Sequence, residues 1–191
     1  KKLGLIIIDE QHKFGVRQRK ELSEKGGNNC DVLVMSATPI PRTMMMTIYG
    51  DMDISLIKSK PKNRLPIKTY SKNETKIHDV INFIKSQITK KNQVFWVCPL
   101  IKESKKIDHQ SATEKYKYLS KIFKDRVDIV HGSMSKEEKD KVLNKFNDRK
   151  IDILVSTTVI EVGIDFPNAN VIVIENSNKY GLSQLHQLRG R

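Results

Sequence analysis

Two adjacent carboxylates directly follow an unbroken apolar run near the start of the chain. The run Leu5–Ile8 leads into Asp9 and Glu10. Strands buried in a parallel sheet have such runs, and open α/β sheets bind ligands at the carboxyl ends of their strands. An Asp in that place can hold Mg²⁺, and a neighbouring Glu can orient or deprotonate an attacking water. A strand that ends in a solvated acidic turn has the same letters, so the motif alone leaves both interpretations open.

A second group of small polar residues follows the next apolar run. Ser36-Ala37-Thr38-Pro39 comes directly after Asp31–Met35, and Ser36 stands 27 residues after Asp9. Alone, this string is typical of an ordinary turn. Because the carboxyl ends of parallel strands meet at one edge of a sheet, we expect its hydroxyls to lie near the acidic pair and to bond to phosphate, backbone or the acidic loop.

Further strings extend the pattern to the end of the chain and carry a family resemblance. In order along the chain, the strings are Asp9–His12, Ser36–Pro39, Phe95–Ile101, His131–Met134, Thr157–Asp165 and Gly181–Arg191. They resemble the ordered motifs of superfamily 2 helicases, from motif II to the start of motif VI. The flanking residues resemble the RecG-type ATP-dependent DNA helicases. The resemblance implies a motor of two RecA-like lobes that uses ATP and Mg²⁺ to remodel branched DNA, such as stalled forks and Holliday junctions, in recombination and repair.

The resemblance also implies roles at the nucleotide. Asp9 would coordinate Mg²⁺, and Glu10 would position the hydrolytic water. Arg191 would act on the phosphates as an arginine finger from the second lobe. The other residues implied at the nucleotide are His12, Gly163, Asp165 and Gln187.

Coupling between nucleotide and DNA is implied for a separate set of residues. Gln11, His12, Ser36 and Thr38 would relay the state of the nucleotide to the DNA. Residues implied at the DNA backbone are Thr157 and Thr158, and the linker charges Lys62 and Arg64 add to them.

Two alternative functions stay open at this point. A transcription-repair coupling translocase shares Pro41-Arg42-Thr43 and the string Gln187–Arg191. A non-catalytic nucleic-acid-binding module is the other alternative, since no G-x-x-x-x-G-K-[ST] phosphate-binding loop occurs in these residues. We therefore expect this chain alone to lack ATPase activity, with the phosphate loop and a DNA wedge domain lying upstream.

Charge supports an anionic partner. The net charge is +13, distributed as +1 over residues 1–57, +4 over 58–66 and +8 over 67–191. Such an excess is typical of proteins that bind nucleic acid, although Lys-rich surfaces can also be merely solvated. We expect DNA as the partner, a monomeric protein, no membrane segment and a cytoplasmic location. The two cysteines, Cys30 and Cys98, have no paired spacing, so we expect neither disulfides nor a zinc site.

The elements that must position these residues alternate between strands and helices, which predicts an α/β fold with parallel sheets. Strands are expected at Leu3–Ile8, Asp31–Met35, Ile67–Ser71, Val94–Cys98, Val127–Val130, Ile151–Val155 and Val171–Ile174. Helices are expected at Val16–Lys25, Arg42–Tyr49, Glu74–Lys90, Ala112–Phe123, Lys136–Asn147 and Ser183–Leu188. Residues 1–57 would be the C-terminal part of the first lobe, 58–66 a basic linker, and 67–191 most of the second lobe.

Local patterns add detail to this plan. Ser135, followed by Glu137 and Glu138, predicts a capped helix start. We expect an exposed loop over Lys102–Lys115 that runs into the next helix. Residues assigned to the core are Ile77, Val80, Ile81, Ile84, Ile88, Trp96, both cysteines and Met44–Met46, whereas His78 and His109 are assigned to the surface.

Overall fold

The computed structural model describes residues 3–9, 30–37, 53–57, 59, 66–99, 105–157 and 166–190, with the backbone alone for 105–110. The chain divides into two compact units, Lys1–Asn63 and Arg64–Arg191. The division falls inside the segment 58–66 that is expected to be the linker. The identification of the two units with a first and a second lobe stays a prediction.

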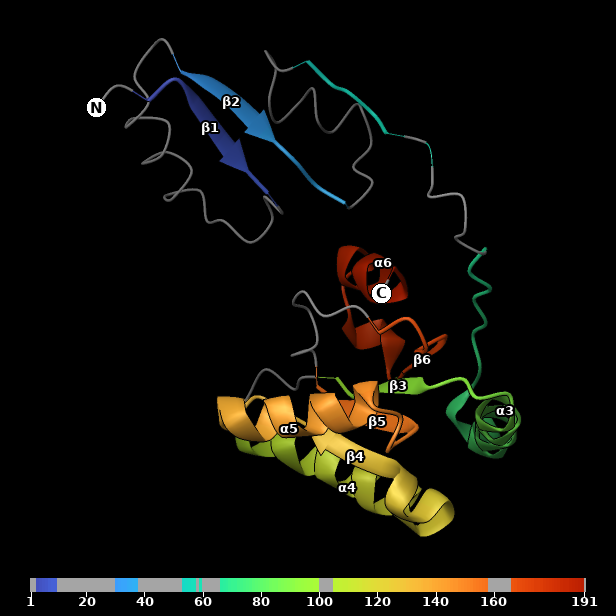
Figure 1. Ribbon diagram of the computed structural model, residues 1–191. Coiled ribbons are helices and arrows are strands. Elements are labelled where there is room, and N and C mark those ends of the chain that lie inside the picture. Colours follow the sequence, from blue (N-terminus) through green and yellow to red (C-terminus); the bar gives the residue numbers. More distant parts are fainter. Residues whose placement is uncertain are drawn as a thin grey trace. The chain divides into compact units, whose positions relative to one another are not determined.

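In the first unit, two short parallel strands form a sheet (Figure 1). Strands β1 (Leu5–Ile8) and β2 (Asp31–Val34) pair in register, with Ile8 opposite Val34. Ile6 and Ile8 are buried, whereas Leu5, Ile7 and Leu33 are 52%, 57% and 48% exposed. Both strands were predicted from the sequence. The predicted helices Val16–Lys25 and Arg42–Tyr49, together with Met44–Met46, lie outside the described residues.

The second unit is built on a four-stranded parallel sheet in the order β4-β5-β3-β6. Its strands are β3 (Val94–Val97), β4 (Val127–Val130), β5 (Ile153–Ser156) and β6 (Val171–Ile174). Every residue of the inner strands β3 and β5 is buried. Unbroken apolar runs without alternation are what a strand covered on both faces requires, and this prediction is confirmed.

The second unit also contains helices. They are α3 (Ile77–Thr89), which continues the 3₁₀ turn η2 (Glu74–Lys76), and α4 (Lys105–Phe123), followed by η3 (Lys124–Arg126). The others are α5 (Lys136–Asn147) and α6 (Leu182–Arg189), the latter preceded by η5 (Ser177–Lys179). The α/β class with parallel sheets and flanking helices is confirmed.

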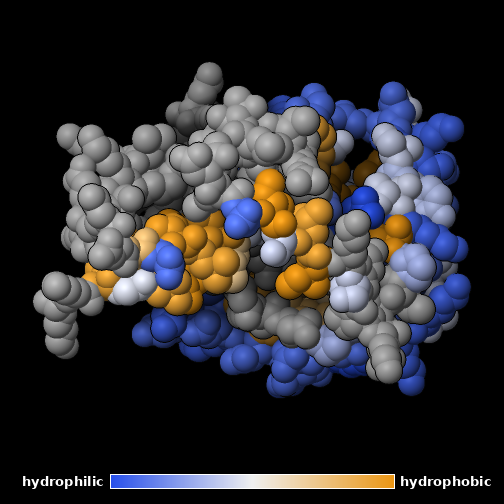
Figure 2. Space-filling view, turned by 90° about the horizontal axis from the view of Figure 1, so that it is seen from above, coloured by the Kyte–Doolittle hydropathy of each residue, from blue (hydrophilic) through white to orange (hydrophobic). Residues whose placement is uncertain are grey.

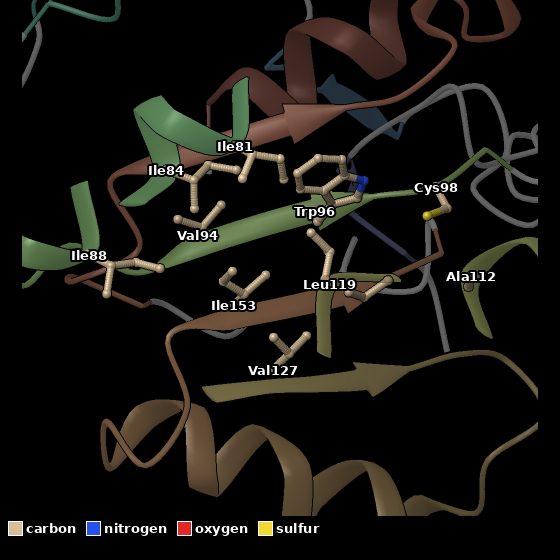
Figure 3. Packing of buried hydrophobic residues seen from close by; sticks show 11 residues of the cluster. Ile81, Ile84, Ile88, Val94, Trp96, Cys98, Ala112, Leu119, Val127 and Ile153 are labelled. Carbon is tan, nitrogen blue, oxygen red and sulfur yellow. The ribbon is translucent and has the colours of Figure 1, made fainter. Parts of the chain in front are cut away.

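One face of the sheet packs against α3 and α4. Ile81, Ile84 and Ile88 form the buried stripe of α3 and pack in one cluster with Val94 and Trp96 of β3 (Figure 3). Ala112 and Leu119 of α4 belong to the same cluster. Trp96 and Cys98 are fully buried, as the sequence predicted, whereas Cys30 is only half-buried.

The opposite face packs against α5. Phe95 of β3, Phe146 of α5 and Phe166 form an aromatic trio whose ring centroids lie 5.1 to 5.5 Å apart. The other buried members of this second cluster are Val130, Val142, Ile151 and Leu154. Edge-to-face and tilted rings at such separations add to the stabilisation that burial provides.

Two local predictions were wrong. Ile67–Ser71 forms no strand, and Ile67 and Tyr70 are 44% and 75% exposed. A β-branched run suits a strand only where another strand offers a hydrogen-bonding edge, and periodicity cannot reveal that partner. The expected loop Lys102–Lys115 is helical from Lys105 onward. Its Lys, Gln, Ala and Glu residues favour helix without forming an apolar stripe.

No helix in the described ranges combines the length and the apolar character that a bilayer span requires.

Candidate functional site at the carboxyl edges of the sheets

Asp9 and Ser36 leave their strands at the same edge of the two-stranded sheet. Asp9 directly follows β1, and Ser36 follows β2 after Met35, whose N–H donates to the Ile8 carbonyl at 2.8 Å. Both residues are exposed, and each has at least one polar or electrostatic interaction with another group. The parallel register thus brings together the acid and the hydroxyl residue that the sequence predicted to be neighbours.

Asp9 fits Mg²⁺ by its chemistry, since this ion is commonly held by one or two carboxylates together with water and substrate phosphates. In the ranges that the structure describes, no group of three or more His, Cys, Asp or Glu side chains could hold a metal ion by itself. Glu10, Gln11, His12 and Thr38 lie outside the described residues.

In the second unit, polar groups gather where the strands of the larger sheet end. Ser156 ends β5 and is fully buried, and Thr157 is 1% exposed. The Thr157 N–H donates to the Val130 carbonyl at 3.4 Å, which joins the ends of β5 and β4. The hydroxyls of Ser156 and Thr157 have no hydrogen-bond partner among the described residues. A contact between the Thr157 hydroxyl and DNA therefore requires that its exposure increases when DNA binds.

A charged and aromatic cluster lies at the neighbouring strand ends. Glu175 follows β6, and its Oε1 lies 2.6 Å from Nζ of Lys115 on α4. The same Nζ lies 5.4 Å from the ring centroid of Trp96 and 5.3 Å from that of Tyr118. Lys115 therefore combines an ion pair with two cation–π contacts. A shallow pocket of about 370 Å³ opens here, lined by Ser111, Glu114, Lys115, Tyr118 and Glu175.

Burial sets the protonation states within this cluster. Desolvation, with the Glu175 carboxylate nearby, raises the pKa of the Cys98 thiol to about 12. The thiol donates to Oε2 of Glu175 at 3.7 Å. Desolvation likewise raises the pKa of Tyr180, and the nearby Cys98 and Glu175 act in the same direction.

Sequence reasoning missed this cluster, although one signal for it was present. Glu175 follows the apolar run Val171–Ile174 in the same way that Asp9 follows Leu5–Ile8. Lys115 stands where the expected loop Lys102–Lys115 runs into the expected helix Ala112–Phe123, and its distance of 60 residues from Glu175 in the chain gives no hint of their pairing.

The remaining predicted site residues are only partly covered. Gln187 lies on α6, is half-buried, and makes an interaction of its own. Thr158, Gly163, Asp165 and Arg191 lie outside the described residues, as do Lys62 and Arg64 of the expected linker.

Comparison with known proteins extends this description. Residues 75–191 match the family model described as the helicase conserved C-terminal domain. The chain is 51% identical over 193 aligned positions to the ATP-dependent DNA helicase RecG of Thermotoga maritima. That alignment covers 100% of this chain and 25% of the relative, so the chain spans about a quarter of the relative's length.

Two solved structures show the same fold. A RecG structure bound to a three-way DNA junction has a TM-score of 0.68 and 46% identity, covering 99% of this chain and 24% of that one. S. cerevisiae Dbp5 bound to RNA and ADP BeF₃ has a TM-score of 0.65 at 20% identity, covering 100% of this chain and 51% of that one. The second likeness shows the fold alone. With its motifs in the same order and about half of its residues shared with RecG helicases, the chain belongs to the helicase conserved C-terminal domain family, in its RecG-type branch.

Proposed function

We propose that the chain is part of the motor of an ATP-dependent DNA helicase that remodels branched DNA in recombination and repair. The observation that carries this proposal is the similarity over the full length of the chain to RecG helicases, one of which was solved on a three-way DNA junction. The edge shared by Asp9 and Ser36 supports it, because ligands bind at the carboxyl ends of strands in such sheets.

At the nucleotide, we assign the first chemical steps to the residues after β1. Asp9 would hold Mg²⁺, which would supply positive charge to offset the charge that develops on the phosphates during hydrolysis. Glu10 orients a water and accepts its proton as the water oxygen attacks the γ-phosphorus. The bond to the β,γ-bridging oxygen breaks, and ADP and phosphate leave.

For the second unit, we assign a set of nucleotide contacts of its own. Gly163 allows close approach of the backbone to the nucleotide, and Asp165 accepts from ribose hydroxyls. Gln187 on α6 and Arg191 just after it face the phosphates, where an Arg can stabilise the transition state.

We assign the coupling of nucleotide and DNA to the small polar residues near both sheets. Gln11, His12, Ser36 and Thr38 connect the ATP site to the neighbouring motifs. Thr157, Thr158, Lys62 and Arg64 contact the DNA backbone, so binding follows charge more than base sequence. We propose that the protein acts as a monomer.

The test is ATP hydrolysis and strand separation by the full-length protein on a three-way junction and on linear duplex of the same length. We expect the junction to stimulate hydrolysis more strongly than the duplex, and three-way junctions to be unwound only with ATP and Mg²⁺. Equal stimulation by plain duplex without unwinding would favour a duplex translocase of the transcription-repair coupling type. DNA binding without any hydrolysis would favour a non-catalytic module.

A further inference from the structure

The segment between β6 and α6 is held at both of its ends. At its start, the Glu175 N–H donates to the Val97 carbonyl at 3.0 Å, which extends the pairing of β6 with β3 by one residue. Asn176 then takes a left-handed conformation with φ 47° and ψ 50°, which turns the chain sharply away from the sheet. At its end, the Gly181 N–H donates to Oε1 of Gln184 at 3.2 Å and starts α6.

Two side chains from outside this segment reach the Glu175 carboxylate. Lys115 reaches it from α4, Cys98 reaches it from the end of β3, and the ion pair is 22% exposed on both sides. Such partial burial weakens solvent screening, so loss of one partner leaves the other charge poorly compensated. The Lys115 ammonium is also held over Trp96, whose indole is fully buried in the core.

Tyr180 lies later in the segment, just before α6. Its hydroxyl is buried without a hydrogen-bond partner in the described part of the chain, and burial raises its pKa, with Cys98 and Glu175 acting in the same direction. The residue lies next to Gly181, where α6 begins. The cluster therefore holds the start of this segment at Glu175, from which the chain turns at Asn176 and continues to α6.

We propose that Lys115, acting through Glu175, is a positioning residue for α6 and thereby for Gln187 at the nucleotide phosphates. The inference rests on the proposed function, which puts Gln187 in contact with the phosphates. The position of Gln187 should affect the rate of hydrolysis more than the affinity for ATP. Displacement of a group by about 1 Å at a reacting centre can lower the rate up to about a hundredfold. Lys115 touches none of the reacting atoms itself.

The experiment uses four variants of the full-length protein: Lys115→Met, Glu175→Gln, Lys115→Arg and the control Lys117→Met. Lys117 lies on the same helix and is exposed. The measurements are kcat and KM for ATP with a three-way DNA junction, and amide hydrogen exchange over residues 182–190. We expect Lys115→Met and Glu175→Gln to lower kcat about tenfold with KM within about twofold, since positioning and not binding is lost. Exchange in α6 should become faster in both.

Lys115→Arg keeps the cation and its contacts with the aromatic rings, so it should restore at least half of kcat and the normal exchange of α6. Lys117→Met should match the unmodified protein. Unchanged exchange of α6 in both Lys115→Met and Glu175→Gln would overturn the inference, as would a kcat within twofold of normal. If the unmodified protein hydrolyses no ATP, the proposed function fails, and the exchange measurement alone decides whether Lys115 positions α6.

Discussion

Gln93 shows how a single buried side chain can hold distant parts of the chain together. It is 2% exposed, and its Nε2 donates to the carbonyls of Phe146 at 2.6 Å and of Ile151 at 2.8 Å. These two carbonyls belong to the end of α5 and the residue pair before β5. Both protons of the amide are therefore used where water does not reach.

Gln93→Ala should lower the free energy of unfolding by about 1–3 kcal/mol, because the buried Ile151 carbonyl loses this donor and the Phe146 carbonyl keeps the Arg149 N–H at 3.1 Å. Chemical denaturation followed by circular dichroism measures the change. Asn82→Ala, an exposed amide on α3, is the control and should stay within about 0.5 kcal/mol. Equal stability of Gln93→Ala and the unmodified chain would mean that the Ile151 carbonyl finds another donor.

The buried Cys98 thiol predicts a dependence of stability on alkaline pH. Its pKa rises from 9.0 in the unfolded chain to about 12 in the folded one, so between these values the unfolded chain ionises while the folded chain stays protonated. The contribution of the neutral thiol to the free energy of unfolding is fully present below pH 9. It falls as pH rises toward 12, by up to about 1.4 kcal/mol per pH unit.

Comparison of the chain with Cys98→Ala reports this effect, since groups away from Cys98 and its neighbour Tyr180 titrate equally in both. The difference in unfolding free energy between the two proteins should shrink from pH 8.5 to pH 10.5. A constant difference over that range would show that the thiol ionises equally in the folded and the unfolded chain.

At the scale of elements, α5 shows what local sequence can predict. Its bounds, Lys136–Asn147, agree with the sequence prediction because the signals are local. Ser135 Oγ accepts from the Glu138 N–H at 3.2 Å, and Glu138 accepts from the Ser135 N–H at 2.8 Å. These hydrogen bonds lower the pKa of the Glu138 carboxyl.

Ser135→Ala should destabilise the chain by about 1 kcal/mol, as is typical of a lost N-terminal cap. Ser133→Ala, three residues before the helix and exposed, is the matched control and should have no measurable effect. Thermal unfolding of the two variants checks the difference. An equal effect of the two substitutions would rule out the capping box as a source of stability.

Elements that depend on distant partners were harder to predict. Strands β3 to β6 were predicted from short runs rich in Val and Ile, of which only β3 and β5 are buried at every residue, whereas the order β4-β5-β3-β6 could not be read from the runs. The segment Ile67–Ser71 has the composition of a strand, yet composition says nothing about a pairing edge. A rule about strand ends predicted that Asp9 and Ser36 lie at one edge of their sheet, whereas the Lys115–Glu175 pair depends on where α4 lies relative to the residue after β6.

For the whole molecule, charge is the property that bears on DNA binding. The net charge of +13 is concentrated in 58–66 and in 67–191. Each phosphate that a protein neutralises adds about 0.9 to the slope of log affinity against log salt for duplex DNA. If the Lys and Arg side chains of these residues contact the DNA phosphates, the affinity for DNA should fall steeply with salt concentration and differ little between DNA sequences.

Changing Lys62 and Arg64 together to Ala should reduce the salt slope by up to about two while leaving sequence discrimination unchanged. Titration of the full-length protein with labelled DNA at several salt concentrations measures both. Lys85→Ala with Lys121→Ala removes the same charge from exposed positions on α3 and α4 and should reduce the slope less. Equal slopes in the two double variants would mean that the linker charge is incidental.

The central claim, hydrolysis of ATP at the acidic pair after β1, is tested most directly by Glu10→Gln in the full-length protein. The amide keeps the shape of the side chain but cannot accept the proton of the water. ATP and DNA should bind with unchanged affinity, while DNA-stimulated kcat should fall by at least about a hundredfold. Glu137→Gln, an exposed change on α5, should leave kcat unaltered. Hydrolysis by Glu10→Gln at the normal rate would contradict the account.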